Sequence, residues 1–212
     1  MARWTEPINL DLPIERPRSV SLGGGSWPFY LDRTHEWAWQ DGIFSDLELD
    51  AIIEIGNRHQ IDRASTYGVT GPEVRSSNVA FIYPNESTDW IFRKMTMATD
   101  QMNREYFGFD LSGFEQGFQF TRYEAPGEHY EWHVDRGRGI PVRKLSVTVQ
   151  LSDPATYEGG DLQISEGLTP ATLERKRGRL TFFPSWIQHR VLPVTSGIRY
   201  SLVAWIGGPP FR

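Results

Sequence analysis

The chain of 212 residues contains no cysteine. Disulfides, thiolate zinc sites, iron–sulfur clusters and cysteine nucleophiles are therefore excluded. Basic residues are also in the minority, since 22 Lys and Arg stand against 27 Asp and Glu, for a formal net charge of -5. A nucleic-acid-binding protein normally carries a basic surface, so this balance argues against a nucleic-acid partner.

Long apolar runs are missing as well. No segment approaches the roughly 20 apolar residues that a membrane-spanning helix needs. The N-terminal residues contain no apolar stretch typical of a signal peptide. From the sequence we therefore expect no membrane partner and a cytoplasmic location; the oligomeric state is left open.

The first 28 residues are rich in Pro and Gly and end in a Gly-Gly-Gly-Ser run. Because Pro and Gly interrupt helices and strands, this composition predicts an irregular N-terminal arm. The remaining residues, 29–212, suit one domain, because a single all-β sandwich or barrel can use a chain of this length.

Two segments have the apolar spacing of amphipathic helices. The first covers residues 45–60, where Ser45 and Glu48 are spaced as in a capping box. Its expected apolar face consists of Leu47, Ile52, Ile53 and Ile55. The second runs from about residue 88 to residue 106, and Gly108 can end it. Its apolar stripe consists of Ile91, Met95, Ala98, Met102 and Tyr106, which we interpret as a core face rather than a ligand surface.

After residue 114 the character of the chain changes to short β-rich runs. They are GFQFTRYE, HYEWHVD, RKLSVTVQLS, GDLQIS, RLTFFP, HRVLPV and RYSLVAWI. Turn signals such as Pro126-Gly127 and Asp153-Pro154 separate them. Many short strands broken by turns indicate a sandwich or a barrel. The expected fold is therefore mainly β, with helices packed outside a C-terminal β-sandwich.

His133-Val134-Asp135 is the most informative tripeptide. In a strand, residues 133 and 135 point to one face with Cα atoms roughly 6.5–7 Å apart, so both side chains can reach one metal ion. His189, one of only five histidines, lies in a later β-rich run and is the candidate third ligand. Two His and one carboxylate form the three-ligand face of non-haem Fe(II) sites.

Arg199 lies ten residues beyond His189 in an otherwise apolar run. A buried guanidinium needs an anionic partner. Two interpretations are open: an ion pair with a protein Asp or Glu, and a bidentate clamp for a dicarboxylate ligand. The neighbouring metal motif favours the clamp.

The order of several motifs carries a resemblance. They are Tyr123, Gly127, Tyr130, His133 and Asp135, then LSVTVQLSDP at 145–154, YEGGDLQI at 157–164, FPSWIQHRVLPVTSGIRY at 183–200 and LVAW at 202–205. In this order and spacing the chain resembles the prolyl-4-hydroxylase-like branch of the 2-oxoglutarate/Fe(II) oxygenases, in particular the bacterial PKHD-type hydroxylases. The resemblance covers roughly residues 115–212, and a combination of motifs is far more specific than any one of them.

The resemblance implies a double-stranded β-helix, or jelly roll, over about residues 115–212 with flanking N-terminal helices. It implies Fe(II), 2-oxoglutarate and O2 as cofactors and cosubstrates, with ascorbate as an optional accessory. The implied iron ligands are His133, Asp135 and His189. Arg199 matches the residue that pairs with the 5-carboxylate of 2-oxoglutarate, and Tyr123 a tyrosine that hydrogen-bonds it. Gln150 occupies a position that is often Tyr or Phe in relatives and is a candidate hydrogen-bond donor to the cosubstrate.

The implied reaction hydroxylates an unactivated C–H bond, with succinate and CO2 as coproducts. The expected substrate is a peptidyl residue, proline first, in a peptide or protein. Two alternatives remain: hydroxylation of a free amino acid or other small molecule, and a non-catalytic β-helix protein that binds a metal or ligand. Turnover of 2-oxoglutarate to succinate separates the last alternative from the first two.

Residues 63–76 are expected to form a flap over the site, because Gly68, Gly71 and Pro72 break regular structure. An ordinary surface loop is the alternative. The candidate substrate-contacting residues are Tyr67 and Arg75 in this segment, Arg143 on the opposite wall, and Tyr130.

Three further motifs have plainer interpretations. His129 and His133 do not form a metalloprotease zinc pair, since Tyr130 stands where that motif needs Glu. The pair Gly159-Gly160 indicates a tight turn, because no P-loop Lys-Ser/Thr follows it. The run ERKRGR at 174–179 is interpreted as a charged turn, with a nucleic-acid patch as the minority alternative.

Overall fold

Two antiparallel sheets make up most of the molecule, whose computed structural model describes residues 34–64, 74–137, 140–166 and 168–210. The larger sheet has nine strands: seven run in the order β1-β12-β8-β14-β6-β4-β2, and β5 and β9 pair with β14. The smaller sheet has the order β11-β10-β13-β7-β3. The predicted arm, residues 1–28, lies outside the described residues.

The elements follow one another along the chain in an order that returns repeatedly to both sheets. They are β1 (Ala38–Gln40), α1 (Asp46–Arg58), β2 (Asp62–Arg63), β3 (Arg75–Ser76), β4 (Asn78–Ile82), α2 (Asp89–Met102), the π-helical η1 (Asn103–Phe107), β5 (Gly113–Phe114), β6 (Phe118–Glu124), β7 (His129–His133), β8 (Arg143–Gln150), the 3-10 turn η2 (Pro154–Thr156), β9 (Tyr157–Gly159), β10 (Leu162–Glu166), β11 (Thr169–Thr172), β12 (Leu180–Pro184), β13 (His189–Val191) and β14 (Val194–Gly207).

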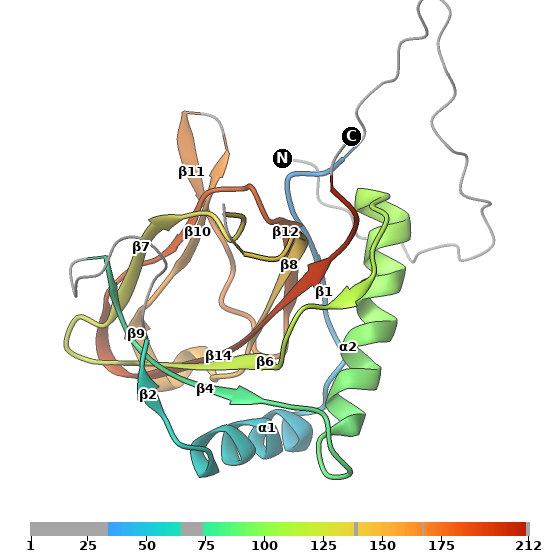
Figure 1. Cartoon of the computed structure of the whole chain (residues 1–212). Helices are drawn as coiled ribbons and strands as arrows, with labels where there is room; N and C mark the ends of the chain where they lie inside the picture. Colours follow the sequence, from blue (N-terminus) through green and yellow to red (C-terminus); the bar gives the residue numbers. More distant parts are fainter. Residues whose placement is uncertain (1–33, 65–73, 138–139, 167, 211–212) are drawn as a thin grey trace, which may run out of the picture.

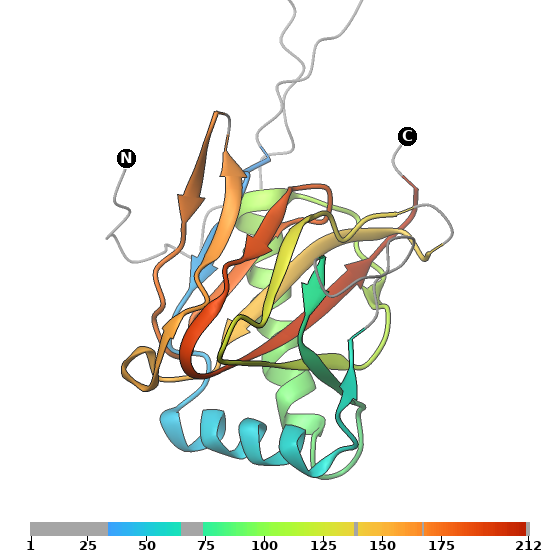
Figure 2. The same ribbon diagram turned by 90° about the vertical axis from the view of Figure 1, so that its left-hand side faces the viewer.

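Both helices cover the outer side of the larger sheet (Figures 1 and 2). The main core lies between them and the sheet. Its largest fully buried side chains include Leu49 and Ile52 from α1, Met95 from α2, and Phe118 and Phe120 from β6. This arrangement leaves the opposite face of the larger sheet free to meet the smaller sheet. The expected jelly roll with flanking helices is confirmed.

The first helix begins as predicted but presents a partly different face. Ser45 accepts a hydrogen bond from the Glu48 amide, and the Glu48 carboxylate accepts one from the Ser45 amide, so the capping box is confirmed. Leu47 was wrongly assigned to the apolar face, because its side chain is 83% exposed. The buried positions are Leu49, Ile52 and Gly56, which recur at helical spacing on the sheet side.

The second helix matches its prediction closely. The α-helix Asp89–Met102 continues as π-helix to Phe107, and Gly108 ends it at a φ of 67°. Glycine adopts this left-handed conformation at little steric cost. Ile91, Met95 and Met102 are fully buried, so the apolar stripe is a core face as expected.

The strand that carries the first metal-ligand candidate is shorter than the sequence pattern suggested. β7 ends at His133, and Asp135 lies in a bend beyond it. The same-face alternation argued for residues 133 and 135 is therefore wrong as a description of the backbone. Their side chains still approach each other, because the bend turns Asp135 back toward the histidine.

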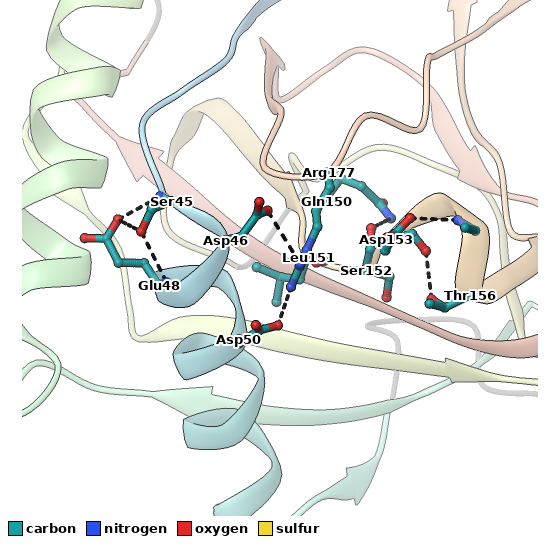
Figure 3. Close-up of polar contacts among 11 residues, drawn as sticks. Ser45, Asp46, Glu48, Asp50, Gln150, Leu151, Ser152, Asp153, Thr156 and Arg177 are labelled. Carbon is teal, nitrogen blue, oxygen red and sulfur yellow. Dashed lines mark hydrogen bonds and ion pairs between the residues drawn. The ribbon is translucent and has the colours of Figure 1, made fainter.

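Residues 174–179 form a charged turn whose basic side chains have carboxylate partners within the protein. Arg177 is held by Asp46 and Asp50 of α1 and also donates its Nε–H to the Leu151 carbonyl at 3.0 Å (Figure 3). The other pairs of this turn are Arg175–Asp161, Lys176–Asp41, Arg179–Asp41 and Arg179–Glu174. The ion pairs of Arg177 therefore link this turn to α1. The positive charges of the turn are paired with carboxylates of the protein itself.

Within the described part of the chain, the helices are too short or too polar to cross a membrane.

Candidate active site

Two neighbouring strands of the smaller sheet hold a cluster of three potential metal ligands. His133 ends β7 and His189 begins β13, and their Cα atoms are partners in the antiparallel register. Asp135 completes the cluster from the bend after β7. Its Oδ1 lies 3.9 Å from His133 Nε2, and its Oδ2 lies 3.6 Å from His189 Nε2.

Backbone hydrogen bonds fix the orientation of both imidazole rings. His133 Nδ1 lies 2.7 Å from the Glu131 carbonyl oxygen, and His189 Nδ1 lies 3.0 Å from the Ile187 carbonyl oxygen. A carbonyl only accepts, so Nδ1 donates in each ring, and in the neutral form of the ring this leaves the lone pair on Nε2. Both Nε2 atoms point to Asp135, as two ligands of one metal ion must.

Burial makes this cluster chemically suited to a cation. Asp135 and His189 are buried, and Asp135 Oδ2 has no hydrogen-bond partner among the described residues. Burial, followed by the proximity of His189, lowers the pKa of His133 to about 3, which keeps the ring neutral. Burial alone would raise the pKa of the Asp135 carboxyl. The nearby His189 and His133 outweigh this effect and hold the pKa below its usual range. An unsatisfied carboxylate oxygen beside two imidazole rings fits a divalent metal.

A cavity of about 950 Å³ opens beside this cluster, between the two sheets. Arg199, from β14, lines the same cavity, and only 3% of its surface is exposed. Its Nε–H is donated to Gln150 Oε1 at 3.1 Å, and its Nη1 has no partner. Among the described residues, no Asp or Glu forms an ion pair with Arg199. The alternative interpretation, a salt bridge from Arg199 to a protein carboxylate, therefore has no support within this part of the chain. A dicarboxylate ligand fits this buried, unpaired cation.

Tyr123 and Gly160 frame the space around Arg199. Tyr123 is the register partner of Arg199 on β6, and its ring centre lies 5.6 Å from the Arg199 guanidinium carbon. Burial raises the pKa of the Tyr123 hydroxyl, so the group stays protonated and able to donate a hydrogen bond. A Cβ atom at Gly160 would come within 3.1 Å of Arg199 Cδ, so glycine leaves room for the arginine stem.

Gln150 was expected to donate a hydrogen bond to the cosubstrate, which would require its side chain to reach the large cavity. It does not line the large cavity, and its amide nitrogen already donates to the Ser152 carbonyl and to the Tyr157 hydroxyl. The predicted hydrogen bond from Gln150 to a cosubstrate is therefore corrected: no amide hydrogen remains for it. The residue contacts Arg199 instead.

Three of the expected substrate residues lie around the metal cluster. The fourth, Tyr67, and most of the predicted flap lie outside the described residues. The Tyr130 ring stacks on His133 with ring centres 3.4 Å apart, and the Arg75 guanidinium lies 4.5 Å above the far side of Tyr130. Arg143 lies 4.0 Å from the ring centre of Trp205 and donates to the Asp135 carbonyl at 3.3 Å. Tyr130, Arg75 and Arg143 all line the large cavity, together with Trp205.

Two residues that contact the site were not anticipated from the sequence. Phe183 packs its ring 4.6 Å from His189, and Tyr157 accepts the hydrogen bond from Gln150. The run RLTFFP predicted a strand but gave no sign that one of its rings would face a histidine. The cross-strand pairing that determines this contact involves residues distant in sequence.

A jelly roll with two histidines and one carboxylate beside an open cavity defines a class, the mononuclear non-haem iron proteins with a facial triad. Within that class, residues 118–207 match the family model of the 2OG-Fe(II) oxygenase superfamily. The part of the chain that carries the triad and Arg199 is therefore similar to this superfamily, and the curated relatives below match the same part of the chain.

The relatives are bacterial hydroxylases. A PKHD-type hydroxylase of Janthinobacterium sp. is 38% identical over 94 residues, and one of Bordetella pertussis is 37% identical over 94 residues. Each alignment spans 41% of this chain and 41% of the relative, so the match covers about two fifths of the relatives' length.

Solved structures share the fold over more of the chain. A prolyl-4-hydroxylase of Pseudomonas putida has a TM-score of 0.68 at 24% identity and covers 84% of this chain and 95% of its own. A prolyl hydroxylase of Trichoplax adhaerens, solved with a peptide fragment of hypoxia inducible factor, has a TM-score of 0.68 at 17% identity and covers 81% and 83%. At these identities the likeness establishes the jelly-roll fold.

Proposed function

We propose that the protein is a 2-oxoglutarate-dependent Fe(II) dioxygenase that hydroxylates an unactivated C–H bond. One observation carries the proposal: the cavity that holds His133, Asp135 and His189 also holds Arg199, a buried cation without a protein carboxylate partner among the described residues. A metal triad and a diacid clamp in one cavity are the two binding functions this chemistry needs. We further propose that residues 29–212 act as one catalytic domain.

His133, Asp135 and His189 would hold Fe(II), and Arg199 would hold the far carboxylate of 2-oxoglutarate. When these groups and O2 are bound, the site supplies oxidative decarboxylation of 2-oxoglutarate to succinate and CO2, coupled to transfer of the second oxygen atom to the substrate C–H bond. Backbone carbonyls orient both histidine rings with Nε2 toward the position of the metal, and Arg199 is buried at the wall of the same cavity.

Tyr123, beside Arg199, would donate its hydroxyl hydrogen to the cosubstrate. It stays protonated because burial raises its pKa. The Phe183 ring packs against His189 and the Tyr130 ring packs against His133, which restricts the positions of the two imidazoles. A low-polarity surround strengthens each charge interaction in the site.

The substrate we propose is a peptidyl residue, with proline first. The cavity volume is at the upper end of what small-molecule sites use, which favours a ligand larger than the cosubstrate alone. Arg143 and Arg75 line its wall, where they would donate hydrogen bonds to the carbonyl groups of a peptide. The Trichoplax adhaerens enzyme of similar fold is described with a bound peptide, which adds support by analogy. A free amino acid is the second candidate, because the same two arginines could hold its carboxylate.

The experiment measures two products from one reaction. Purified protein with Fe(II), 2-oxoglutarate and O2 is assayed for succinate, and proline-containing peptides and free amino acids in the mixture are searched by mass spectrometry for a gain of one oxygen. Succinate coupled to a hydroxylated peptide supports the proposal in full. Hydroxylation restricted to free amino acids replaces the peptide with the second candidate. No succinate from metal-loaded, folded protein would overturn the oxygenase assignment.

A further inference from the structure

Gln150 lies on the far side of Arg199 from the large cavity. A second cavity of about 20 Å³ is lined by Gln150 and Arg199 together with Thr148, Gly160 and Thr181. Arg199 and Thr148 line both cavities, whereas Gln150 lines only the small one. A molecule bound in the large cavity beside the metal ligands would therefore contact Arg199 directly. Gln150 would influence that molecule only through its hydrogen bond to Arg199.

The hydrogen bonds of the Gln150 amide allow one orientation. Its Nε2 lies 3.2 Å from the Ser152 carbonyl oxygen, which can only accept, and 3.0 Å from the Tyr157 hydroxyl. Both amide hydrogens are thereby committed. The Oε1 atom must then face Arg199, and it accepts the Nε–H at 3.1 Å. Only 8% of the Gln150 surface is exposed, so bulk solvent has little access to these contacts.

This contact divides the donors of Arg199 between protein and ligand. Of the five N–H groups of a guanidinium, the one on Nε is used by Gln150. The Nη atoms form the remaining edge, and Nη1 is buried with no partner. A carboxylate in the large cavity would therefore be met by the Nη edge. Gln150 is also neutral, so it accepts from Arg199 without cancelling the positive charge that an anionic ligand needs.

We propose that Gln150 is a positioning residue for Arg199 that sets the preference of the site for a diacid. Locked by Ser152 and Tyr157, it holds the guanidinium with its Nη edge toward the large cavity and leaves its full charge for the distal carboxylate. This inference rests on the proposed function and adds to it a residue that touches neither cosubstrate nor metal.

The first test variant replaces the neutral acceptor beside Arg199 with a charged one of similar shape; it also removes the two Nε2 donors, which the second variant below removes without adding charge. Gln150→Glu places a carboxylate beside Arg199 Nε, where it forms an internal ion pair and competes with the ligand. Gln163→Glu is the matched control, because Gln163 Oε1 likewise accepts a hydrogen bond from an arginine Nε, that of Arg190 at 2.8 Å, and neither residue lines either cavity.

Binding is measured by titration calorimetry with Mn(II) in place of Fe(II), for 2-oxoglutarate and for 2-oxopentanoate, which lacks the distal carboxylate. In Gln150→Glu we expect the affinity for 2-oxoglutarate to fall by about tenfold or more, a change of about 1.4 kcal/mol. The affinities for Mn(II) and 2-oxopentanoate should stay at the wild-type value. Gln163→Glu should resemble wild type throughout.

Gln150→Leu covers the case in which the glutamate variant does not fold. It removes the acceptor and leaves Arg199 Nε unpaired, so we expect the same selective loss for the diacid, smaller in size. Equal 2-oxoglutarate affinity in wild type and a folded Gln150 variant overturns the positioning role. A parallel loss for both 2-oxo acids also overturns it, because general damage to the site would then explain the effect. Failure of wild type itself to bind 2-oxoglutarate counts against the proposed function instead.

Discussion

His133 and His189 are register partners on adjacent antiparallel strands, and each ring is held by the carbonyl two residues before it. The two strands thus present two Nε2 lone pairs from equivalent backbone positions. The rings have centres 4.1 Å apart and are tilted by 54°, so they do not stack flat on each other. Asp135 then supplies the only charge of the proposed ligand set.

Replacing Asp135 by Ala should abolish turnover and weaken Fe(II) binding by about 100-fold or more, because removal of a ligand costs at least as much as the loss of an outer-shell partner. Metal affinity is measured anaerobically by calorimetry. Asp110→Asn is the control, since Asp110 is an exposed carboxylate in the loop after η1. Wild-type iron affinity and activity in Asp135→Ala would mean that the metal, if any, binds elsewhere.

Replacing Arg199 by Ala should raise the KM for 2-oxoglutarate strongly and leave Fe(II) affinity near its wild-type value. Losing one partner of a buried charged contact typically costs about 2–5 kcal/mol, which corresponds to roughly 30-fold or more in affinity. The measurement is succinate production as a function of 2-oxoglutarate concentration. Arg122→Ala is the control, because Arg122 pairs with Glu124 on the neighbouring strand β6. Unchanged KM in Arg199→Ala would show that the diacid is held by another residue.

Tyr130 should matter through its ring rather than its hydroxyl. The ring stacks on His133 at 3.4 Å and 15°, and Arg75 covers its other side. Tyr130→Phe keeps both contacts and should retain wild-type metal affinity, whereas Tyr130→Ala should lose about tenfold, the lower range for a residue that orients a metal ligand. Both are compared by calorimetry with Mn(II). A loss of the same size in both variants would assign the effect to the hydroxyl instead.

The sequence predicted those parts of the site that depend on local pattern. The strand run containing Arg199 and the turn at Gly159-Gly160 could be predicted because strand and turn propensities act over a few residues. The turn is confirmed by positive φ angles at both glycines. The capping box of Ser45 and Glu48 was predictable for the same reason.

The errors arose where long-range packing decides the outcome. Leu47 and Leu49 are equivalent in local pattern, and only the position of the sheet below α1 determines that Leu49 is buried. Gln150 was expected to face the cosubstrate, but its direction is set by Tyr157 and Ser152, and by Arg199 across 49 positions of sequence. Asp135 was expected in a strand, whereas β7 ends two residues earlier.

Asp41 should give the fold a stabilising contribution that is lost in acid. Its carboxylate accepts two hydrogen bonds of 2.9 Å from Arg179, Nε to Oδ1 and Nη2 to Oδ2, and a third from Lys176. The hydrogen bonds from Arg179 hold the pKa of Asp41 below its usual value of 3.8; partial burial opposes this effect and Lys176 adds to it. The folded state thus releases the proton more readily than the unfolded state, so the stabilisation is present above about pH 4 and is lost as the pH falls through the folded pKa.

Asp41→Asn should therefore lower the free energy of unfolding by about 1 kcal/mol at pH 7, a modest value because the Asp41 side chain is 30% exposed. The difference from wild type should shrink as the pH falls below about 4 and through the folded pKa, since protonated Asp41 resembles Asn. Urea unfolding with a chelator present keeps metal binding out of the comparison. Glu174→Gln is the control: Glu174 pairs with the same Arg179 but is 69% exposed, so its loss should change stability by only a few tenths of a kcal/mol. A difference between wild type and Asp41→Asn that stays constant down to pH 2.5 would show that the contribution comes from packing rather than from charge.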